Sequence, residues 1–256
     1  PLSHLFGQSM ATYIPPRIDG TVVFMRSYNP HDIARRVKDW RISVIVCVPK
    51  MLEVLRGHAI RLDPAAANPP GGLSILARWW RYRRIHGAFG MKFWAFVVGA
   101  APLDPILEDF WKRLGFVVIQ GYGLTETAPI VTLNNPFRTN TGSVGTPIAG
   151  VEVKIADDGE ILVRGENVST GYYEPGSGPA SARQRPGELW RGLAEAASGR
   201  EGGTRDLGSG RMQDAEGWLH TGDVGELDAS GRLFIRGRKK EMIVTPEGLN
   251  VFPDDV

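Results

Sequence analysis

Two short apolar runs, each followed by a loop of small residues, constrain the fold of this chain more than any other feature. The first run, residues 93–98, precedes Gly99-Ala100-Ala101-Pro102. The second, residues 116–119, precedes residues 121–127. Runs this short and this rich in apolar residues are typical of buried parallel strands. A helical pattern over residues 103–114 separates them, so a right-handed crossover would place both loops at one edge of the sheet, where α/β folds bind ligands.

The loop after the second run is Gly121-Tyr122-Gly123-Leu124-Thr125-Glu126-Thr127. Its two glycines would let the backbone turn sharply and let a flat ligand approach the ring of Tyr122. The hydroxyl of Thr125 and the carboxylate of Glu126 suit a phosphate group that carries magnesium, because hydroxyls bind phosphate oxygens and carboxylates bind the metal. The alternative is a plain strand-to-loop turn with a threonine cap.

The composition is that of an ordinary globular protein. The 256 residues are 42% hydrophobic and 23% charged, and both values are usual. A formal net charge of +2 provides no argument for a nucleic-acid partner. The single cysteine, Cys47, lies in an apolar run and is interpreted as a buried small hydrophobe. The sequence contains no run that could span a bilayer, and we expect a cytoplasmic protein, with peripheral membrane binding as a second option.

Residues 73–86 have a helical pattern in which Trp79, Trp80 and Tyr82 alternate with arginines. Aromatic and basic residues in alternation are found on nucleic-acid-binding surfaces. The other interpretation is a helix whose aromatic side chains pack inward while its arginines stay in water. We favour this second interpretation, because no other part of the chain carries a nucleic-acid motif.

Residues 1–136 alternate between strand and helix patterns, which predicts an α/β subdomain with a mostly parallel sheet flanked by helices. Residues 137–237 consist of hairpin patterns around glycine turns and predict a small antiparallel, β-barrel-like subdomain. Within it, residues 176–211 are rich in Gly, Ser and Arg and have little periodicity, so we expect a flexible insertion.

Six motifs occur along the chain in a fixed order. They are Gly99-Ala100-Ala101-Pro102-Leu103, residues 121–127, Gly142-Ser143-Val144-Gly145, Val163-Arg164-Gly165-Glu166 with Gly171-Tyr172-Tyr173, Gly217-Trp218-Leu219-His220-Thr221-Gly222-Asp223, and Gly237-Arg238-Lys239-Lys240-Glu241. In this order they resemble the adenylate-forming, or AMP-binding, superfamily of acyl-CoA synthetases, luciferases and peptide-synthetase adenylation domains. Residues 238–253 look most like medium- and long-chain acyl-CoA synthetases.

The resemblance implies a nucleotide site. Tyr122 would stack on adenine, Thr125 would contact the α-phosphate, and Glu126 would hold Mg²⁺. Asp223 would accept hydrogen bonds from both ribose hydroxyls, and Arg238 would assist it there. The other residues implied in binding ATP or AMP are Gly99, Ala100, Ala101, Pro102, Gly121, Gly123, Leu124 and Ile235.

The resemblance also implies an acyl pocket and a hinge. His4 would close the acyl pocket, and Gly248 would lie near the tunnel for the pantetheine arm of coenzyme A. Lys240 would be the hinge about which a C-terminal domain rotates, so residues 238–256 would be the hinge and the start of a truncated domain. The implied substrate-binding residues are His4, Gly99, Gly123 and Gly248, and the implied catalytic residues are Thr125, Glu126 and Lys240.

The reaction implied by the resemblance has two steps. A carboxylate attacks the α-phosphate of ATP and releases pyrophosphate, and a thiol, usually that of coenzyme A, then displaces AMP from the acyl-adenylate. An amino-acid substrate is disfavoured, because residues 1–8 contain no acidic side chain to bind its amine. We therefore expect a fatty or other carboxylic acid. The alternatives are a fatty acyl-AMP ligase that loads a carrier protein, and a non-catalytic nucleotide- or acyl-binding chain.

The family's phosphate loop and its lysine-bearing C-terminal domain do not occur in this sequence, and they would lie before Pro1 and after Val256. We therefore expect an internal fragment that does not turn over by itself. ATP–pyrophosphate exchange by the 256-residue chain should be no faster than that of a Glu126→Ala control. Exchange clearly above this control would contradict the expectation.

Overall fold

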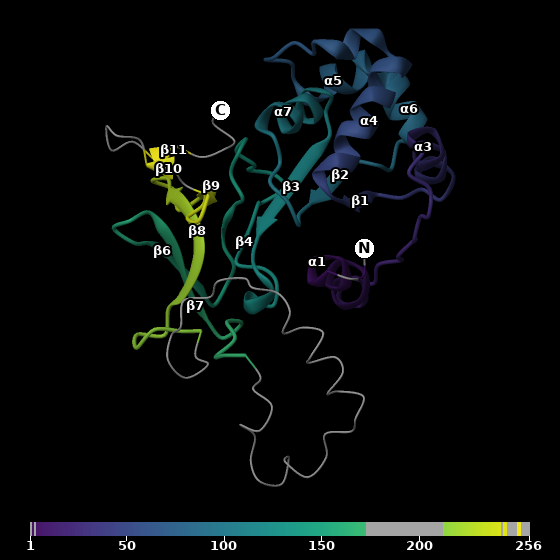
Figure 1. Ribbon diagram of the computed structural model, residues 1–256. Helices are drawn as coiled ribbons and strands as arrows, with labels where there is room; N and C mark the ends of the chain where they lie inside the picture. The colour runs from purple at the N-terminus through teal and green to yellow at the C-terminus, as the bar shows by residue number, and fades with distance from the viewer. Residues whose placement is uncertain (1, 3, 173–211, 242, 245–249, 252–256) are drawn as a thin grey trace, which may run out of the picture.

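The fold is described by a computed structural model, which covers residues 2, 4–172, 212–241, 243–244 and 250–251 (Figure 1). The expected flexible insertion at 176–211 and Gly248 lie outside the described residues. Ten helical segments are present in the described ranges, and their bounds are as follows: α1 (Leu5–Gln8), η1 (Ser9–Tyr13), α2 (Ile14–Arg17), α3 (Pro30–Asp39), α4 (Pro49–Leu62), η2 (Pro64–Ala67), α5 (Ile75–Arg81), α6 (Arg83–Phe89), α7 (Pro105–Arg113) and η3 (Thr125–Thr127).

Two larger sheets organise the chain. The first has the order β1 (Val44–Cys47), β2 (Ala95–Val98), β3 (Val117–Tyr122), β4 (Thr132–Leu133) and β5 (Thr146–Pro147). Its first three strands are parallel, and β4 and β5 are antiparallel additions. The second sheet is antiparallel, with the order β6 (Val151–Ile155), β7 (Glu160–Gly165), β8 (Leu219–Leu227) and β9 (Leu233–Arg238). A short hairpin pairs β10 (Ile243–Val244) with β11 (Asn250–Val251).

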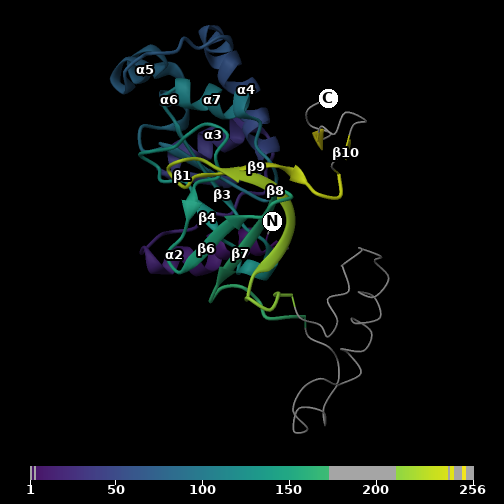
Figure 2. The same ribbon diagram turned by 90° about the vertical axis from the view of Figure 1, so that its left-hand side faces the viewer.

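This architecture confirms the predicted fold class. Figures 1 and 2 show α3–α7 on one side of β1–β3, and α1 and α2 on the other side. The second sheet curls into a half-barrel, and β8 carries a register shift between Val224 and Gly225 in its pairing with β9. Bulges of this kind bend a strand and increase its twist. Within the described residues, no helix is both long and apolar enough to cross a membrane.

Local chemistry explains where the main helices begin. The side chain of Asn29 accepts a hydrogen bond from the backbone N–H of His31, and Pro30 follows it in the first turn of α3. Asp104 caps α7 in the same way, with Pro105 after it. A side-chain oxygen at the N-cap satisfies a helix N–H that has no partner within the helix, and proline tolerates the first turn. The helix expected over residues 73–86 is instead two helices, α5 and α6, which break at Tyr82.

The core of the first sheet is an aromatic cluster. Phe93, Phe96, Trp111 and Phe116 are almost completely buried, and each has a ring centroid within 6.3 Å of another aromatic ring in the cluster. Edge-to-face and tilted contacts of this kind contribute beyond the area that they bury. The cluster joins β2 to α7, so it sets the path of the crossover that leads into β3. Cys47 is half-buried rather than fully buried.

Glu108 of α7 is a buried carboxylate that links three parts of the fold. Its Oε2 accepts hydrogen bonds of 2.8 Å from the side-chain amide of Gln120 in β3 and from the backbone N–H of Gly142. Its Oε1 lies 2.6 Å from Nζ of Lys112. A buried charge is tolerated only when such partners surround it. Glu108 therefore ties β3, whose end forms the cavity described below, to both α7 and the loop before β5.

Neighbouring positions on α7 provide a matched stability test. Glu108 and Asp109 each form an ion pair with the basic residue four positions later, but Glu108 is fully buried whereas Asp109 is 41% exposed. Glu108→Ala should lower the free energy of unfolding by about 3–5 kcal/mol, because it leaves the partly buried ammonium of Lys112 and the buried amide of Gln120 without their partner. Asp109→Ala should change it by less than about 1 kcal/mol. Urea unfolding measures both, and equal losses would contradict the assignment.

Candidate active site

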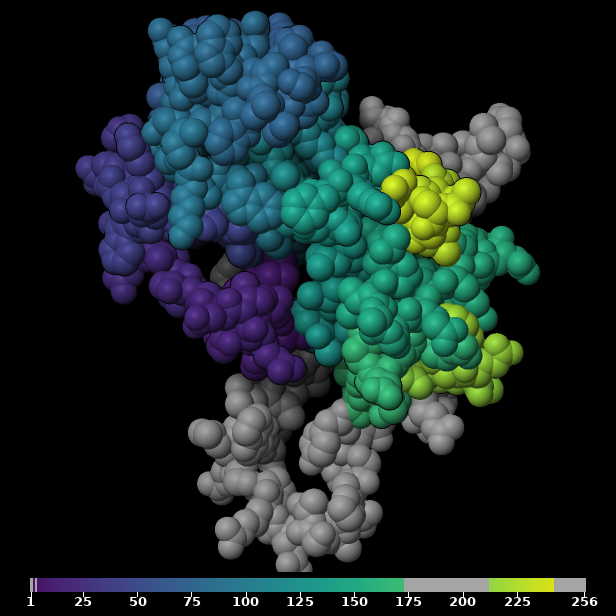
Figure 3. Space-filling view, turned by 180° about the vertical axis from the view of Figure 1, so that it is seen from behind, coloured from purple at the N-terminus to yellow at the C-terminus, as the bar shows by residue number. Residues whose placement is uncertain are grey.

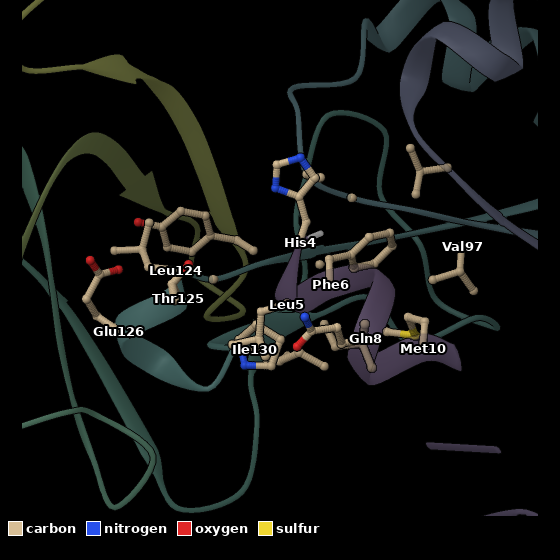
Figure 4. A pocket seen from close by; sticks show the side chains of 18 of the residues that line it. His4, Leu5, Phe6, Gln8, Met10, Val97, Leu124, Thr125, Glu126 and Ile130 are labelled. Atoms are coloured by element: carbon tan, nitrogen blue, oxygen red, sulfur yellow. The ribbon is translucent and has the colours of Figure 1, made fainter. Parts of the chain in front are cut away.

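A cavity of about 610 Å³ opens where β2 and β3 end. This volume lies in the range of small-molecule sites. Residues from α1 and η1 form one wall, and the loops after β2 and β3 form the rest (Figure 4). The lining residues are His4, Leu5, Phe6, Gln8, Met10, Val97, Val98, Gly99, Ala100, Gly121, Tyr122, Gly123, Leu124, Thr125, Glu126, Pro129, Ile130, Leu133 and Arg238.

Two of the lining glycines have no room for a side chain. A Cβ on Gly123 would lie 1.9 Å from the carbonyl oxygen of Pro129, because the loop folds back on itself there. A Cβ on Gly99 would lie 2.8 Å from the ring of Phe6. Beside Gly99, Ala100 has a φ of 68°, a left-handed conformation that is unfavourable for residues other than glycine. A side chain is therefore excluded at both positions, because the ring of Phe6 and the carbonyl of Pro129 fill the space that it would need.

Tyr122 and Asp223 form a buried hydrogen bond between the two sheets. The hydroxyl of Tyr122, at the end of β3, donates to Oδ2 of Asp223 in β8 at 2.7 Å. Arg238 pairs with Asp223 across the β8–β9 ladder, and its Nε lies 3.3 Å from Oδ1 of the carboxylate. Burial raises the pKa of the Asp223 carboxyl above its ordinary value, and the hydrogen bond from Tyr122 and the charge of Arg238 oppose this shift. Burial also raises the pKa of the Tyr122 hydroxyl, with Asp223 adding to the effect.

Glu126 and Tyr172 form a second long-range contact. The hydroxyl of Tyr172 donates to Oε1 of Glu126 at 2.7 Å. This hydrogen bond raises the pKa of Tyr172 to about 12, so the hydroxyl stays protonated and remains a donor. The backbone carbonyl of Glu126 also accepts a hydrogen bond from the backbone N–H of Ser169. The hydroxyl of Tyr172 therefore fixes the position of one carboxylate oxygen of Glu126, Oε1.

The cavity has a polar end and an apolar end. In Figure 4, Thr125 and Glu126 lie at one end, and Phe6, Met10 and Val97 lie at the other. The N-terminal turns supply most of the apolar wall, and the loop after β3 supplies the carboxylate and the hydroxyl. Such a cavity suits an elongated ligand that is charged at one end and apolar at the other.

Most of the residues that sequence reasoning selected meet at this cavity. His4, Gly99, Ala100, residues 121–126 and Arg238 all line it. Asp223 reaches it through its contacts with Tyr122 and Arg238. Among the described residues, four others do not line it. Ala101 and Pro102 are the exposed second half of the loop after β2, Ile235 packs partly buried against the core of the second sheet, and Lys240 lies in the turn after β9. The roles of all these residues remain predictions.

Tyr172 and Phe6 are site residues to which the sequence analysis gave no role. Tyr172 belongs to the Gly171-Tyr172-Tyr173 motif, so the motif was a signal, but only the structure shows that its hydroxyl meets Glu126. Phe6 follows His4 by two residues and presses against Gly99 of the first small-residue loop. The contact between this aromatic ring and a glycine is a tertiary contact, and no local sequence pattern predicts it.

The metal-ligating side chain at the cavity fits a magnesium ion that is bound jointly by the protein and a nucleotide. Among the described residues, no group of three or more His, Cys, Asp or Glu side chains could enclose a metal alone. Glu126 is one partly exposed carboxylate at the edge of the cavity. Magnesium usually takes one or two protein carboxylates and completes its shell with water and substrate phosphates. Glu126 fits that pattern, with Oε2 facing no described hydrogen-bond partner in the protein.

The segment predicted to be a hinge follows an anchored residue, Lys239. The backbone N–H of Lys239 donates to the carbonyl of Gly222 at 2.9 Å. Its ammonium group pairs with Glu160, 3.0 Å away, and with Asp158. Glu160 is buried, and it also accepts a hydrogen bond from the backbone N–H of Gly222. Lys239 therefore fixes the end of β9 to β7 and β8, immediately before Lys240.

Comparison with known proteins defines the class. The family model of AMP-binding enzymes matches residues 1–173. The chain therefore belongs to the AMP-binding enzyme family, which confirms the resemblance found in its motifs.

Particular relatives are acyl-CoA ligases. The chain is 37% identical, over 172 residues, to the long-chain-fatty-acid–CoA ligase FadD15 of Mycobacterium bovis. The aligned residues cover 67% of this chain and 24% of that protein. It is 30% identical, over 262 residues, to the 3-[(3aS,4S,7aS)-7a-methyl-1,5-dioxo-octahydro-1H-inden-4-yl]propanoyl:CoA ligase of Rhodococcus jostii. This alignment covers 100% of this chain and 40% of that protein. The chain thus spans between a quarter and two fifths of these curated relatives.

The fold is shared with solved structures. The O-succinylbenzoate coenzyme A synthetase (MenE) from Bacillus subtilis, in complex with AMP, superposes with a TM-score of 0.64 at 24% identity. It covers 100% of this chain, which in turn covers 43% of that structure. At this identity the likeness concerns the fold only.

The raised pKa of Asp223 makes a prediction with a definite sign. A carboxyl whose pKa is higher in the folded state stabilises the fold below its unfolded pKa and loses that contribution as the pH rises through the folded pKa. Asp223→Asn should therefore raise the free energy of unfolding at neutral pH. This increase over the wild type should become smaller as the pH is lowered toward the ordinary pKa of aspartate. Urea unfolding from acidic to neutral pH measures the effect.

Asp228 in the β8–β9 turn is the control for this experiment. Backbone hydrogen bonds from Arg232, with Ser230 adding to them, lower its pKa. Its contribution is therefore present above the unfolded pKa and is lost as the pH falls. Asp228→Asn should lower the free energy of unfolding at neutral pH. If the two variants shifted stability in the same direction, the account of Asp223 would be wrong.

Proposed function

We propose that this chain carries the nucleotide and acyl site of an acid–CoA ligase, which activates a carboxylic acid with ATP and transfers the acyl group to coenzyme A. The observation that carries the proposal is the convergence of Tyr122, Asp223 and Arg238 beside a cavity with a polar and an apolar end. An acyl-adenylate also has a polar end, the adenylate, and an apolar end, the acyl chain.

Each group of the site has a task in this proposal. The Asp223 carboxylate accepts from the two ribose hydroxyls, and Arg238 supplies a positive charge nearby. The hydroxyl of Thr125 donates to an oxygen of the α-phosphate. Glu126 holds Mg²⁺, which offsets negative charge on the phosphates when it is bound. Donors and charges that are already in position stabilise the charge that develops as a carboxylate attacks phosphorus.

A fatty acid is the proposed substrate. The apolar end of the cavity, with Phe6, Met10 and Val97, offers methyl, thioether and aromatic surface to an alkyl chain. The name of the FadD15 relative points to the same substrate class. His4, beside this wall, remains the proposed gate of the acyl pocket.

Coenzyme A is the proposed acyl acceptor. The names of the matched relatives support it. The alternative is a fatty acyl-AMP ligase that loads a carrier protein. Its support in the sequence is an insertion at 176–211 and the residues 253–256, and both ranges lie outside the described part of the chain. A thioester assay on the full-length protein, with coenzyme A and holo carrier protein offered side by side, decides between the two acceptors.

Two ligands test the two ends of the site separately. A stable dodecanoyl-adenylate analogue should bind the chain at least about tenfold more tightly than AMP, because its alkyl chain leaves water. Met10→Glu should weaken binding of the acyl analogue but not binding of AMP, since it places a carboxylate on the apolar wall. Asp223→Ala should weaken both ligands by about tenfold or more, since a hydrogen-bonded charge is lost. Titration calorimetry gives both affinities for each variant.

Asp228→Ala, in the turn after β8, is the matched control and should leave both affinities unchanged. Equal binding of AMP by the wild type and Asp223→Ala would overturn the nucleotide assignment. Equal binding of AMP and the acyl analogue by the wild type would overturn the fatty-acid assignment and leave the nucleotide assignment standing.

A further inference from the structure

Helix α5 is amphipathic, but most of its apolar side chains are exposed. At 100° per residue, Ile75, Leu76, Trp79 and Trp80 share one sector of about 140° of the helix. Of these, Ile75, Leu76 and Trp80 are 55%, 79% and 74% exposed. Trp79 lies partly inward, stacked on His86 with a centroid distance of 4.6 Å. The interpretation favoured from the sequence, that the aromatics pack inward, is therefore wrong for Trp80 and correct for Tyr82, which is buried.

An arginine fixes this orientation. Arg78 lies on the opposite side of α5 and donates from Nε to the carbonyl of Leu73 at 2.8 Å. It also donates from a terminal guanidinium nitrogen to the carbonyl of Lys112, at the end of α7, at 2.9 Å. The polar side of the helix is thus the side that is bonded to the protein. Exposed groups of large apolar side chains on one element mark interaction sites more often than scattered single residues do.

The segment that carries this face is basic. Residues 64–103 contain no Asp or Glu. Arg81, Arg83 and Arg84 follow the apolar residues at the helix junction and are all exposed. The guanidinium group of Arg83 lies 5.2 Å from the ring centroid of Trp80, over its face. We name the surface formed by Ile75, Leu76, Trp80, Arg81, Arg83 and Arg84 the α5 patch.

We propose that the α5 patch docks the protein onto a membrane surface that contains anionic lipid. Leucine, isoleucine and tryptophan with adjacent arginines are the composition of helices that lie in the interface, where the apolar side chains enter the acyl boundary and the cations meet lipid phosphates. A second copy of the chain fits less well, because two such patches would bring like charges together. A nucleic acid would leave Ile75 and Leu76 without an apolar partner.

The position of the patch is compatible with a working site. In Figures 1 and 2, α5 lies at the end of the molecule away from α1, which borders the cavity. The space-filling view shows the blue helical layer, which includes α5, at the same end (Figure 3). Docking through α5 therefore leaves the nucleotide cavity facing water, so vesicles should not change the affinity for AMP.

Sedimentation with vesicles tests the proposal on the 256-residue chain. Binding should be strong for phosphatidylcholine vesicles that contain phosphatidylglycerol, weak for pure phosphatidylcholine, and reduced by added salt. Replacing Arg81, Arg83 and Arg84 together with Gln should weaken binding roughly 100-fold, since each basic residue contributes about 1 kcal/mol near such a surface. The double variant Leu76→Ser/Trp80→Ser should weaken it at least about tenfold.

Phe137→Ser is the matched control, because Phe137 is 88% exposed but lies outside the patch. It should bind vesicles like the wild type. The proposal is overturned if the chain does not bind anionic vesicles, or if the double variant binds them as the wild type does. It is also overturned if the patch instead mediates self-association in sedimentation velocity or binds single-stranded RNA in preference to vesicles. None of these outcomes bears on AMP binding, so the proposed function is tested separately.

Discussion

The hydrogen bond from Tyr122 to Asp223 is the contact on which the site depends most. It joins the end of β3 in one sheet to β8 in the other, across 101 positions of sequence. Tyr122 packs in the same apolar cluster as residues of β7, β8 and β9, so its ring and its hydroxyl hold the two sheets in one arrangement. A cavity built at the junction of two sheets is only as well defined as the contacts that cross that junction.

The same contact places an acidic group where water is scarce. Desolvation disfavours the charged form of Asp223, while Tyr122 and Arg238 favour it. A carboxylate in that balance is short of hydrogen-bond donors, and a ribose diol would supply two. If Asp223 binds the ribose as proposed, the ionised carboxylate that lowers the stability of the fold is the same group that binds the ligand.

The sequence predicted the parts of the fold that local patterns determine. The apolar run before Gly99 located the end of β2, and a parallel crossover brought Gly99 and Gly123 to one cavity. Strand β3 instead continues through Gly121 and Tyr122, which the sequence assigned to a loop, because these two residues pair with β4. Features that depend on long-range partners were not predictable. The orientation of α5 depends on Arg78, which donates to the carbonyl of Lys112, 34 residues away. Tyr172 meets Glu126 across 46 residues.

Gly123 has a consequence for how sites of this kind can diversify. Because the carbonyl of Pro129 occupies the space of a side chain there, mutation cannot reshape this part of the wall without unfolding the loop. The opposite wall, from the N-terminal turns, is made of side chains that can change in size one at a time. Variation in ligand preference should therefore accumulate in α1 and η1, while the backbone floor after β3 stays the same.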